Sequence, residues 1–362
     1  MVSSLSNEGS QFLFVSCQVG AEPALKREIA RDYPDFHFAF SRPGFVTFKS
    51  AKVLEASFEL HSVFARAYGL SYGKLEKADG ASVLGKVREM TERSAPFQLH
   101  VWERDRHAPG EEPLGFVRDA LETAALSKIL DADTDGLFSR KLDVRTGDLV
   151  IDVIVIEQDE WWIGMHSHTS DHAPQPGAKP GLILPSDAPS RAWLKLEESL
   201  LVSGADVRPG DVAVELGSAP GGATFALLNR GLHVVGVDPG EMHPSVMENP
   251  NFMHMKCTAA ELMRRDLPDN IQWFLNDMNV EPRISMFAVD KLASRMKFSL
   301  LGVLLTIKLN KWSMADEIPG WLEHLRAMGM VHVRATQLFH NRQEVFIFGL
   351  TKKGTQRCSA PF

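Results

Sequence analysis

The stretch DVAVELGSAPGG, Asp211 to Gly222, decides the fold of the second half of this chain. Apolar residues run through 212–216 and predict a buried strand, and the small residues of 217–222 predict a tight loop. Because this loop carries little side-chain bulk, a ligand can approach its backbone at the carboxyl end of the strand. The next strand pattern, HVVGVD, ends at Asp238, whose carboxylate can accept hydrogen bonds from both ribose hydroxyls. The pattern therefore predicts a nucleotide-like ligand.

The composition of the loop indicates which nucleotide-like ligand to expect. A dinucleotide fingerprint is G-x-G-x-x-G, but Ala219 replaces its second glycine, and Pro220 lacks the N–H that a pyrophosphate would use. A ligand with a ribose and no phosphate suits this loop better. We therefore expect S-adenosylmethionine rather than NAD. The alternative, a glycine-rich turn without a ligand, is disfavoured by the acid at Asp238.

Length and composition are those of an ordinary globular protein. The chain has 362 residues, of which 44% are hydrophobic and 23% charged. No apolar run reaches membrane-spanning length, and no basic segment followed by an apolar one opens the chain, so we expect a cytoplasmic protein. Cys17, Cys257 and Cys358 lie far apart, which favours free thiols and gives no cysteine-based zinc site. We expect no bound metal. The net charge of −7 neither supports nor excludes RNA as a partner.

Five prolines within 173–189 predict a linker. The segment before it, 1–172, alternates strands and helices in two small α/β units, an arrangement typical of ferredoxin-like folds. We expect strands at 11–17, 44–50, 97–104, 148–156 and 160–167, and helices at 22–32, 52–60, 81–93 and 113–129.

The segment after the linker, 190–354, predicts a doubly wound α/β sheet. A helix near 190–200 is followed by alternating strands and helices, including a helix after the strand at 251–256. Two consecutive strands at 330–339 and 343–350 end the pattern, so we expect an antiparallel hairpin at the sheet edge. This ending is typical of Rossmann-like methyltransferases. Residues 355–362 remain as a tail.

Four charged residues mark the expected strand ends and the helix before the loop. Asp277 ends a strand at the edge where open α/β sheets bind ligands. Lys308 is the one charge within the apolar run LLGVLLTIKLN, so it either reaches solvent at the sheet edge or meets a substrate. Glu344 begins the last strand, and Lys195 lies in the helix before the loop. Taken singly, each is more often a solvated surface residue than a catalytic one.

Several motifs together resemble the ribosomal RNA large subunit methyltransferase M family of FtsJ-like enzymes. They are PSRAWLKLEE (189–198), ELGSAPGG (215–222), VDPGEM (237–242), NDM (276–278), IKLN (307–310) and QLFHNRQEV (337–345). The resemblance implies a Rossmann-like class I methyltransferase domain preceded by a ferredoxin-like and THUMP region that binds RNA. It further implies transfer of a methyl group from S-adenosylmethionine to the ribose 2′-oxygen of a cytidine in 23S rRNA.

The resemblance also implies roles for individual residues. Lys195, Asp277, Lys308 and Glu344 would form the K-D-K-E tetrad, with Lys308 as the base that takes the proton of the 2′-hydroxyl. Asp277 would orient Lys195 and the methyl donor, and Glu344 would hold Lys308 or the ribose. The residues expected to bind the cofactor are Ser190, Gly217, Ala219, Pro220, Gly221, Gly222, Asp238, Thr258 and Asp277. Where relatives carry an acid near the adenine, this sequence has Cys257 and Thr258, so backbone groups are expected to contribute there.

Other classes of protein fit the sequence less well. A methyltransferase acting on base nitrogens would carry an N-P-P-[YF]-like motif where this chain has NDMNVEP, and a carbon-5 pyrimidine methyltransferase would need a nucleophilic cysteine in the core. An RNA-binding assembly factor that has lost catalysis remains the alternative, although all four tetrad positions are filled. His340 is expected to contact RNA or to pack within its loop. We expect a monomer with RNA as its partner.

Overall fold

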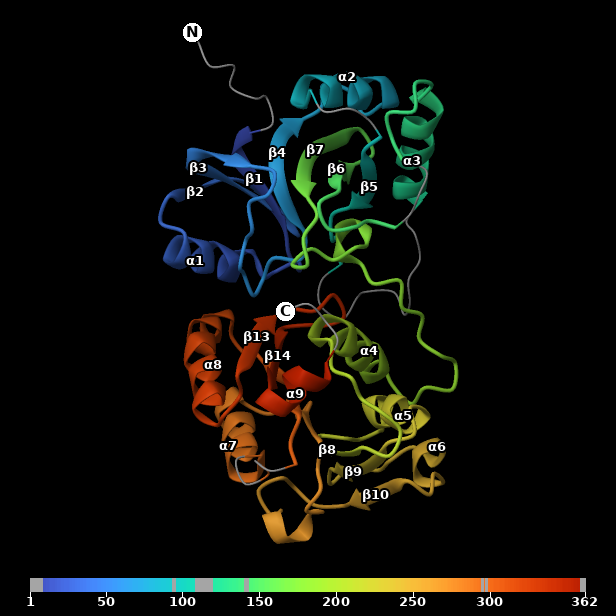
Figure 1. Ribbon diagram of the computed structural model, residues 1–362, viewed down its shortest axis with the longest axis vertical. Helices are drawn as coiled ribbons and strands as arrows, with labels where there is room; N and C mark the ends of the chain where they lie inside the picture. Colours follow the sequence, from blue (N-terminus) through green and yellow to red (C-terminus); the bar gives the residue numbers. More distant parts are fainter. Residues whose placement is uncertain are drawn as a thin grey trace. The chain divides into compact units, whose positions relative to one another are not determined.

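The structure is a computed structural model that describes residues 9–92, 96–107, 120–139, 143–293, 296 and 299–358. It divides the chain into two compact units, Met1–Gly181 and Leu182–Phe362 (Figure 1). Among the helices of the described residues, none is both long enough and apolar enough to cross a membrane. The three cysteines are free thiols.

The first unit is built on one seven-stranded sheet with the order β2-β3-β1-β4-β7-β6-β5. Its strands are β1 (Gly9–Ser16), β2 (Phe36–Arg42), β3 (Phe45–Glu55), β4 (Tyr68–Lys74), β5 (Gln98–Glu103), β6 (Leu149–Glu157) and β7 (Glu160–Ser167). Its helices are α1 (Glu22–Asp32), α2 (Gly80–Met90) and α3 (Ala120–Ala132), with a short 3-10 turn η1 (Pro176–Ala178). Because β1 and β7 both pair with β4, the two small units expected from the sequence share a single sheet.

Two expectations for the first unit differ from the structure, and part of a third lies outside the described residues. The helix expected at 52–60 is wrong, because β3 continues to Glu55 and pairs there with Gly9 of β1. The strands β2 and β4 were not expected, although FHFAFSR carries a phenylalanine and YGLSYGK a tyrosine or leucine at every second position, which is the period of a strand. Of the helix expected at 113–129, the part before Ala120 lies outside the described residues.

The second unit contains a seven-stranded sheet with the order β10-β9-β8-β11-β12-β14-β13. Its strands are β8 (Val212–Leu216), β9 (His233–Val237), β10 (Phe252–Met255), β11 (Trp273–Asn276), β12 (Gly302–Lys308), β13 (His332–Thr336) and β14 (Glu344–Leu350). Its helices are α4 (Ala192–Ser203), α5 (Gly222–Asn229), α6 (Pro244–Met247), α7 (Pro282–Ala293), α8 (Ile318–Ala327) and α9 (Lys352–Arg357), with 3-10 turns η2 (Arg264–Asp266) and η4 (Trp312–Glu317). Figure 1 shows α4 and α5 on one side of this sheet and α7 and α8 on the other.

This second sheet confirms the expected Rossmann-like architecture. Strands β8 to β12 run parallel, and β14 pairs antiparallel with both β12 and β13, which gives the expected hairpin at the edge. The chain order reverses between β8 and β11, because β9 and β10 extend the sheet on one side and β12 on the other. Ligands of open α/β sheets bind at the carboxyl ends of the strands at such a switch point. The loop after Leu216 and the residue Asp277 both lie there.

Two short segments of the second unit differ from expectation. Between β10 and β11 the expected helix is reduced to the single turn η2. Residues 355–357, expected to be part of a tail, belong to α9, where Arg357 pairs with Asp211 at 2.7 Å and Gly354 packs on the backbone of Leu301. The side chain of Cys358 is buried in the same core. These contacts hold the end of the described chain against the sheet.

Candidate active site

Four charged side chains from four separate elements meet at the carboxyl ends of the central strands. Lys195 comes from α4, Asp277 follows β11, Lys308 ends β12, and Glu344 begins β14. The antiparallel register of β12 and β14 places Lys308 directly opposite Glu344. The parallel pairing of β11 and β12 brings Asp277 to the same edge. The structure thus unites the four residues that the sequence suggested as a tetrad.

The tetrad is a closed ring in which each lysine contacts both carboxylates. Lys195 Nζ lies 2.5 Å from one oxygen of Asp277 and 3.3 Å from Glu344 Oε1. Lys308 Nζ lies 3.3 Å from the other oxygen of Asp277 and donates a short hydrogen bond to Glu344 Oε2. Two cations and two anions balance within the ring, so it carries no net charge when all four groups are ionised. Such mutual pairing fixes the position of every ammonium group.

Charge pairing outweighs burial at two members of the tetrad. Burial alone would lower the pKa of Lys195, but the negative charges of Asp277 and Glu344 raise that pKa above its usual range. Burial alone would likewise raise the pKa of Glu344, whose side chain is only 4% exposed, but Lys195 and Lys308 lower that pKa below its usual range. Lys195 therefore stays cationic and Glu344 stays anionic around neutral pH.

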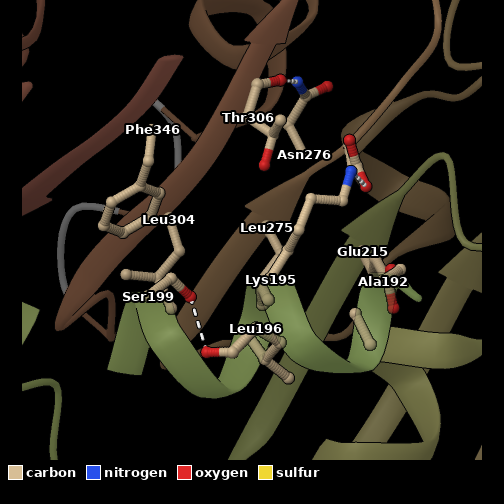
Figure 2. Close-up of a pocket in the computed structure, with 12 residues that line it drawn as sticks. Ala192, Lys195, Leu196, Ser199, Glu215, Leu275, Asn276, Leu304, Thr306 and Phe346 are labelled. Atoms are coloured by element: carbon tan, nitrogen blue, oxygen red, sulfur yellow. Dashed lines mark hydrogen bonds and ion pairs between the residues drawn. The ribbon is translucent and has the colours of Figure 1, made fainter. Parts of the chain in front are cut away.

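A small cavity of about 30 Å³ lies beside the tetrad (Figure 2). Figure 2 shows Lys195 rising from α4 along one wall, with Asn276 and Thr306 joined by a hydrogen bond at the opposite end. The amide oxygen of Asn276, which also lines the cavity, is buried and has no hydrogen-bond partner. A cavity of this size accommodates about one or two waters. Its lining residues are Ala192, Lys195, Leu196, Ser199, Glu215, Ala223, Leu275, Asn276, Asp277, Leu304, Thr306 and Phe346.

The loop between β8 and α5 is built for close backbone approach. Gly217 has a φ of +79° and Gly221 a φ of +116°, conformations that side chains disfavour. A Cβ at Gly217 would lie 2.7 Å from the amide nitrogen of Met278, so the loop packs directly against the backbone that carries Asp277. A Cβ at Gly222 would lie 2.3 Å from Ser190 Oγ. Ser190, the loop and the tetrad residue Asp277 therefore adjoin one another.

Asp238 faces the same loop from the end of β9. Its carboxylate accepts hydrogen bonds from the backbone N–H groups of Ala219, at 3.2 Å, and Gly240, at 2.7 Å. The side chain is only partly buried, which leaves acceptor capacity toward solvent. Pro220 adds no donor to this loop. The cradle therefore offers a carboxylate and closely approachable backbone, which suits a ribose and does not suit a pyrophosphate.

Thr258 already donates hydrogen bonds to another residue of the protein. It lies on the surface after β10, and both its N–H and its hydroxyl donate to the carboxylate of Glu261, each at 2.8 Å. The expected contact of Thr258 with the cofactor would require this pair to open. Cys257, beside it, is partly buried, and burial raises the pKa of its thiol.

Glu198, a residue for which the sequence predicted no role, fixes the loop before Glu344. Its buried carboxylate accepts hydrogen bonds from the backbone N–H groups of Phe339, at 2.6 Å, and His340, at 2.9 Å, and contacts His340 Nδ1 at 2.8 Å. In the same loop Asn341 donates to Glu344 Oε1 at 3.3 Å. His340 is thus a packed loop residue. The sequence feature that could have indicated this role is the acid itself, one turn after Lys195 on a largely apolar helix face.

Glu215, on β8, is a second residue whose importance was not expected. It is fully enclosed and accepts a hydrogen bond of 2.5 Å from the hydroxyl of Thr224. Burial raises its pKa to about 8, and the negative charges of Asp277 and Asp238 act in the same direction. Glu215 is therefore largely protonated at neutral pH, in the wall of the small cavity.

Comparisons with known proteins find a family match and curated relatives. Residues 188–313 match the family of FtsJ-like methyltransferases. The ribosomal RNA large subunit methyltransferase M of Methylococcus capsulatus is 34% identical over 183 residues, which are 48% of this chain and 51% of that protein. The protein of the same name from Sodalis glossinidius is 33% identical over 209 residues, 55% of this chain and 56% of the relative. The chain spans about half the length of these curated relatives.

Among solved structures, the Methanococcus jannaschii fibrillarin pre-rRNA processing protein aligns with 55% of this chain and 82% of its own, at 13% identity and a TM-score of 0.35. The family match covers Ser190, the loop 217–222, Asp277 and Lys308, while Glu344 lies beyond it. Fold, site geometry and sequence similarity converge on the second unit. Residues 188–313 are therefore similar to FtsJ-like methyltransferases, and about half of this chain is similar to the ribosomal RNA large subunit methyltransferase M proteins.

Proposed function

We propose that this protein is an RNA methyltransferase that uses S-adenosylmethionine to methylate the ribose 2′-oxygen of a cytidine in 23S rRNA. One observation carries the proposal: Lys195, Asp277, Lys308 and Glu344 form a single ion-paired ring at the switch point of the sheet, against the loop at Gly217. The names of the homologous proteins support rRNA as the substrate class.

The residues that would hold the cofactor are Ser190, the loop 217–222 and Asp238. The positive φ of Gly217 and the close packing at Gly222 keep the loop free of side chains, so it fits a ligand that needs direct backbone contact. When bound, S-adenosylmethionine supplies an electrophilic methyl group on a sulfonium. Asp277, which packs against this loop and also belongs to the tetrad, would join the cofactor site to the reacting oxygen.

Lys308 would remove the proton from the ribose hydroxyl. A 2′-hydroxyl is a poor nucleophile, and a base that takes its proton lowers the barrier as the new O–C bond forms and the methyl–sulfur bond of the sulfonium breaks, which would leave a neutral thioether. In the ring Lys308 Nζ donates to both carboxylates, so it must release one proton before it can accept another. Lys195, which stays cationic, would hold Asp277 and Glu344 in place throughout. Glu344 would keep the amine of Lys308 pointed at the substrate.

We further propose that the first unit binds the RNA and that the protein acts as a monomer in the cytoplasm. A methyl-transfer assay tests the core of the proposal. The purified protein is incubated with isotopically labelled S-adenosylmethionine and 23S rRNA, and the RNA is digested to nucleosides and analysed by mass spectrometry. Labelled 2′-O-methylcytidine is the expected product. Label on a base, or no label although calorimetry detects cofactor binding, would instead favour another methyl acceptor or an inactive assembly factor.

A further inference from the structure

The sheet of the first unit carries its helices on one face. On this face, α2 and α3 pack on a core that includes Leu70 of β4. Leu70 pairs with Leu13 of β1, and Leu13 pairs with Phe48 of β3. Phe48 pairs with Phe38 of β2, and the ammonium group of Lys26 on α1 lies 4.0 Å from the ring centroid of Phe38. Because residues directly opposite each other on antiparallel strands share a face, α1, α2 and α3 all lie on the same side of the sheet.

The opposite face presents aromatic and basic side chains along β1, β2 and β3. Thr47 and Lys49 flank Phe48 along β3, so both point away from the helices. Phe12 of β1 pairs with Lys49 and therefore shares this face. A bulge shifts the register of β2, so that Phe40 pairs with Thr47 and lies on this face too.

The rings on this face are open to solvent or half-buried, and two of them lie beside a cation. Phe12 is 40% exposed, and Lys49 Nζ lies 5.7 Å from its ring centroid. Phe40 stacks on Trp162 of β7 with centroids 5.1 Å apart, and both rings are partly exposed. The guanidinium of Arg42 lies 5.1 Å from the centroid of Phe40. The aromatic–basic face consists of Phe12, Phe40, Arg42, Lys49 and Trp162.

Positive charge dominates the edge of the aromatic–basic face at Arg42. Arg104 and Arg106 hold the carboxylate of Glu157, with nitrogen–oxygen distances of 2.8 and 3.4 Å. The hydrogen bond from Arg104, with the nearby charges of Arg106 and Arg42, lowers the pKa of this carboxyl. Within the part of the chain that the structure describes, neither Arg42 nor Lys49 has an acid as an ion-pair partner. Both cations can therefore meet an anion, in a chain whose net charge is −7.

We propose that the aromatic–basic face binds a single-stranded segment of the RNA substrate. Bases would stack on Phe12 and on the pair of Phe40 and Trp162. Phosphates would meet Lys49 and Arg42. Aromatic rings that stack bases, together with cations that follow the backbone, are what proteins use to hold single strands. This inference rests on the proposed function, since it takes RNA as the substrate and names the surface that would bind it.

The chemistry of the aromatic–basic face favours an unpaired strand over other partners. In a duplex the bases stack on one another and cannot reach the rings of a protein surface, so a paired segment fits less well. An apolar protein surface would leave the charges of Arg42 and Lys49 buried without partners, which is costly. A polyanion with exposed base planes satisfies both the rings and the cations.

The helix-bearing side of the sheet supplies a matched control. Phe38 is 55% exposed, more than Phe12, and a lysine ammonium likewise lies over its ring. Phe38→Ala therefore removes the same kind of side chain from the same small sheet without changing the aromatic–basic face.

The test titrates the full-length protein with a fluorescently labelled oligouridine of about 12 nucleotides and with an RNA duplex of the same length. Anisotropy at several salt concentrations measures the affinities, and we expect the single strand to bind more tightly than the duplex. Phe12→Ala should weaken binding of the single strand by about 5- to 100-fold, the usual loss of one stacked base. Lys49→Gln should lower the slope of log affinity against log salt by about 0.7, the value of one phosphate contact. Phe38→Ala should change neither quantity.

Three results would overturn the inference: wild-type affinity in Phe12→Ala, an equal loss in Phe38→Ala, or a wild type that binds the duplex at least as tightly as the single strand. If circular dichroism shows that Phe12→Ala does not fold, Arg42→Gln takes its place, with the same change of salt dependence expected as for Lys49→Gln. Failure here is distinguishable from failure of the proposed function. Weaker binding by Phe12→Ala without any methylated product would refute the proposed chemistry alone, whereas methylation with unaltered binding would refute this inference alone.

Discussion

Lys195 and Lys308 share the same two carboxylates, yet they have different roles in our account. Asp277 and Glu344 keep Lys195 cationic, so it acts as a fixed charge. Lys308 ends β12, and in our proposal its amine takes the proton of the substrate hydroxyl. The ring explains why a lysine can be positioned so tightly in a partly buried site. It also makes the base assignment testable by substitutions that keep or remove the charge.

Replacement of Lys308 by alanine should lower kcat by about 10²- to 10⁴-fold, the usual contribution of a general base, while the cofactor still binds. Lys308→Arg should be almost as damaging, because a guanidinium keeps its proton at working pH. Stopped-time methylation assays and calorimetry measure these quantities, with the exposed Lys352→Ala as control. An arginine variant with near wild-type rate would leave this residue only an electrostatic role.

Glu215 should make the protein less stable in alkaline solution. The folded state keeps its proton up to about pH 8, whereas the unfolded chain releases it near the ordinary value of 4.5. Folding stability therefore falls as pH rises between these values, because the folded state binds more protons than the unfolded state there. Glu215→Gln, which can still accept from Thr224, should raise the Tm at pH 9 and change it little at pH 5. An equal shift at both pH values would show that the carboxyl is not protonated in the folded protein.

At the scale of elements, Glu198 links α4 to the loop that delivers Glu344. One carboxylate accepts from two loop N–H groups, and the loop in turn contacts Glu344 through Asn341. This contact joins segments more than 140 residues apart in the sequence. It connects α4, which carries Lys195, to the loop before β14, which begins with Glu344. The contact therefore helps to position both side chains in the tetrad.

Glu198→Ala should loosen this loop and lower kcat by about 10- to 100-fold, because a small misplacement of a catalytic group is costly. Cofactor affinity should change little, since the loop at Gly217 is untouched. Hydrogen exchange at 339–341 should speed up in the variant. The matched control is Glu197→Ala, also on α4, which removes the ion pair with Arg230 at the end of α5. Equal losses of activity in both variants would refute a positioning role for Glu198.

Much of the second unit could be predicted because its strands have a clear apolar sequence pattern. The apolar runs of β8, β9, β12 and β14 are buried along most of their length, as parallel and central strands require. The first unit was harder, because β2 is exposed over much of its length and β4 is interrupted by two glycines, so neither has the continuous apolar run of a buried strand. The helix expected at 52–60 failed since pairing with β1 outweighed local pattern. Long-range pairing of this kind leaves no local signal.

The four tetrad residues were predictable through resemblance, since each alone looks like a surface charge. The role of Glu198 depends on a contact with a distant loop, and that of Glu215 on the depth of its burial, so neither could be read from sequence spacing. That three histidines and Asp152 share one buried region likewise depends on the fold rather than on sequence spacing.

At the scale of the whole molecule, two compact units with separate sheets are joined within a proline-rich segment. The net charge of −7 shows that RNA binding, if the first unit provides it, depends on local rather than overall positive charge. A protein restricted to 182–362 should bind S-adenosylmethionine as tightly as the full chain. Its rate of rRNA methylation should fall by roughly 10²-fold or more, because the fragment lacks the first unit. In the full chain, RNA bound to the first unit would be present at a high effective concentration for the second. Full activity of this fragment would remove the RNA-binding role from the first unit.

A map of ribose methylation in ribosomal RNA decides whether the tetrad methylates a ribose of rRNA. Ribosomal RNA is compared between cells with the gene, cells without it, and cells complemented with either the wild-type gene or Lys308→Ala. We predict that a single cytidine in 23S rRNA loses its 2′-O-methyl group without the gene and regains it only with the wild type. Identical maps in all four strains, or full restoration by Lys308→Ala, would contradict the account.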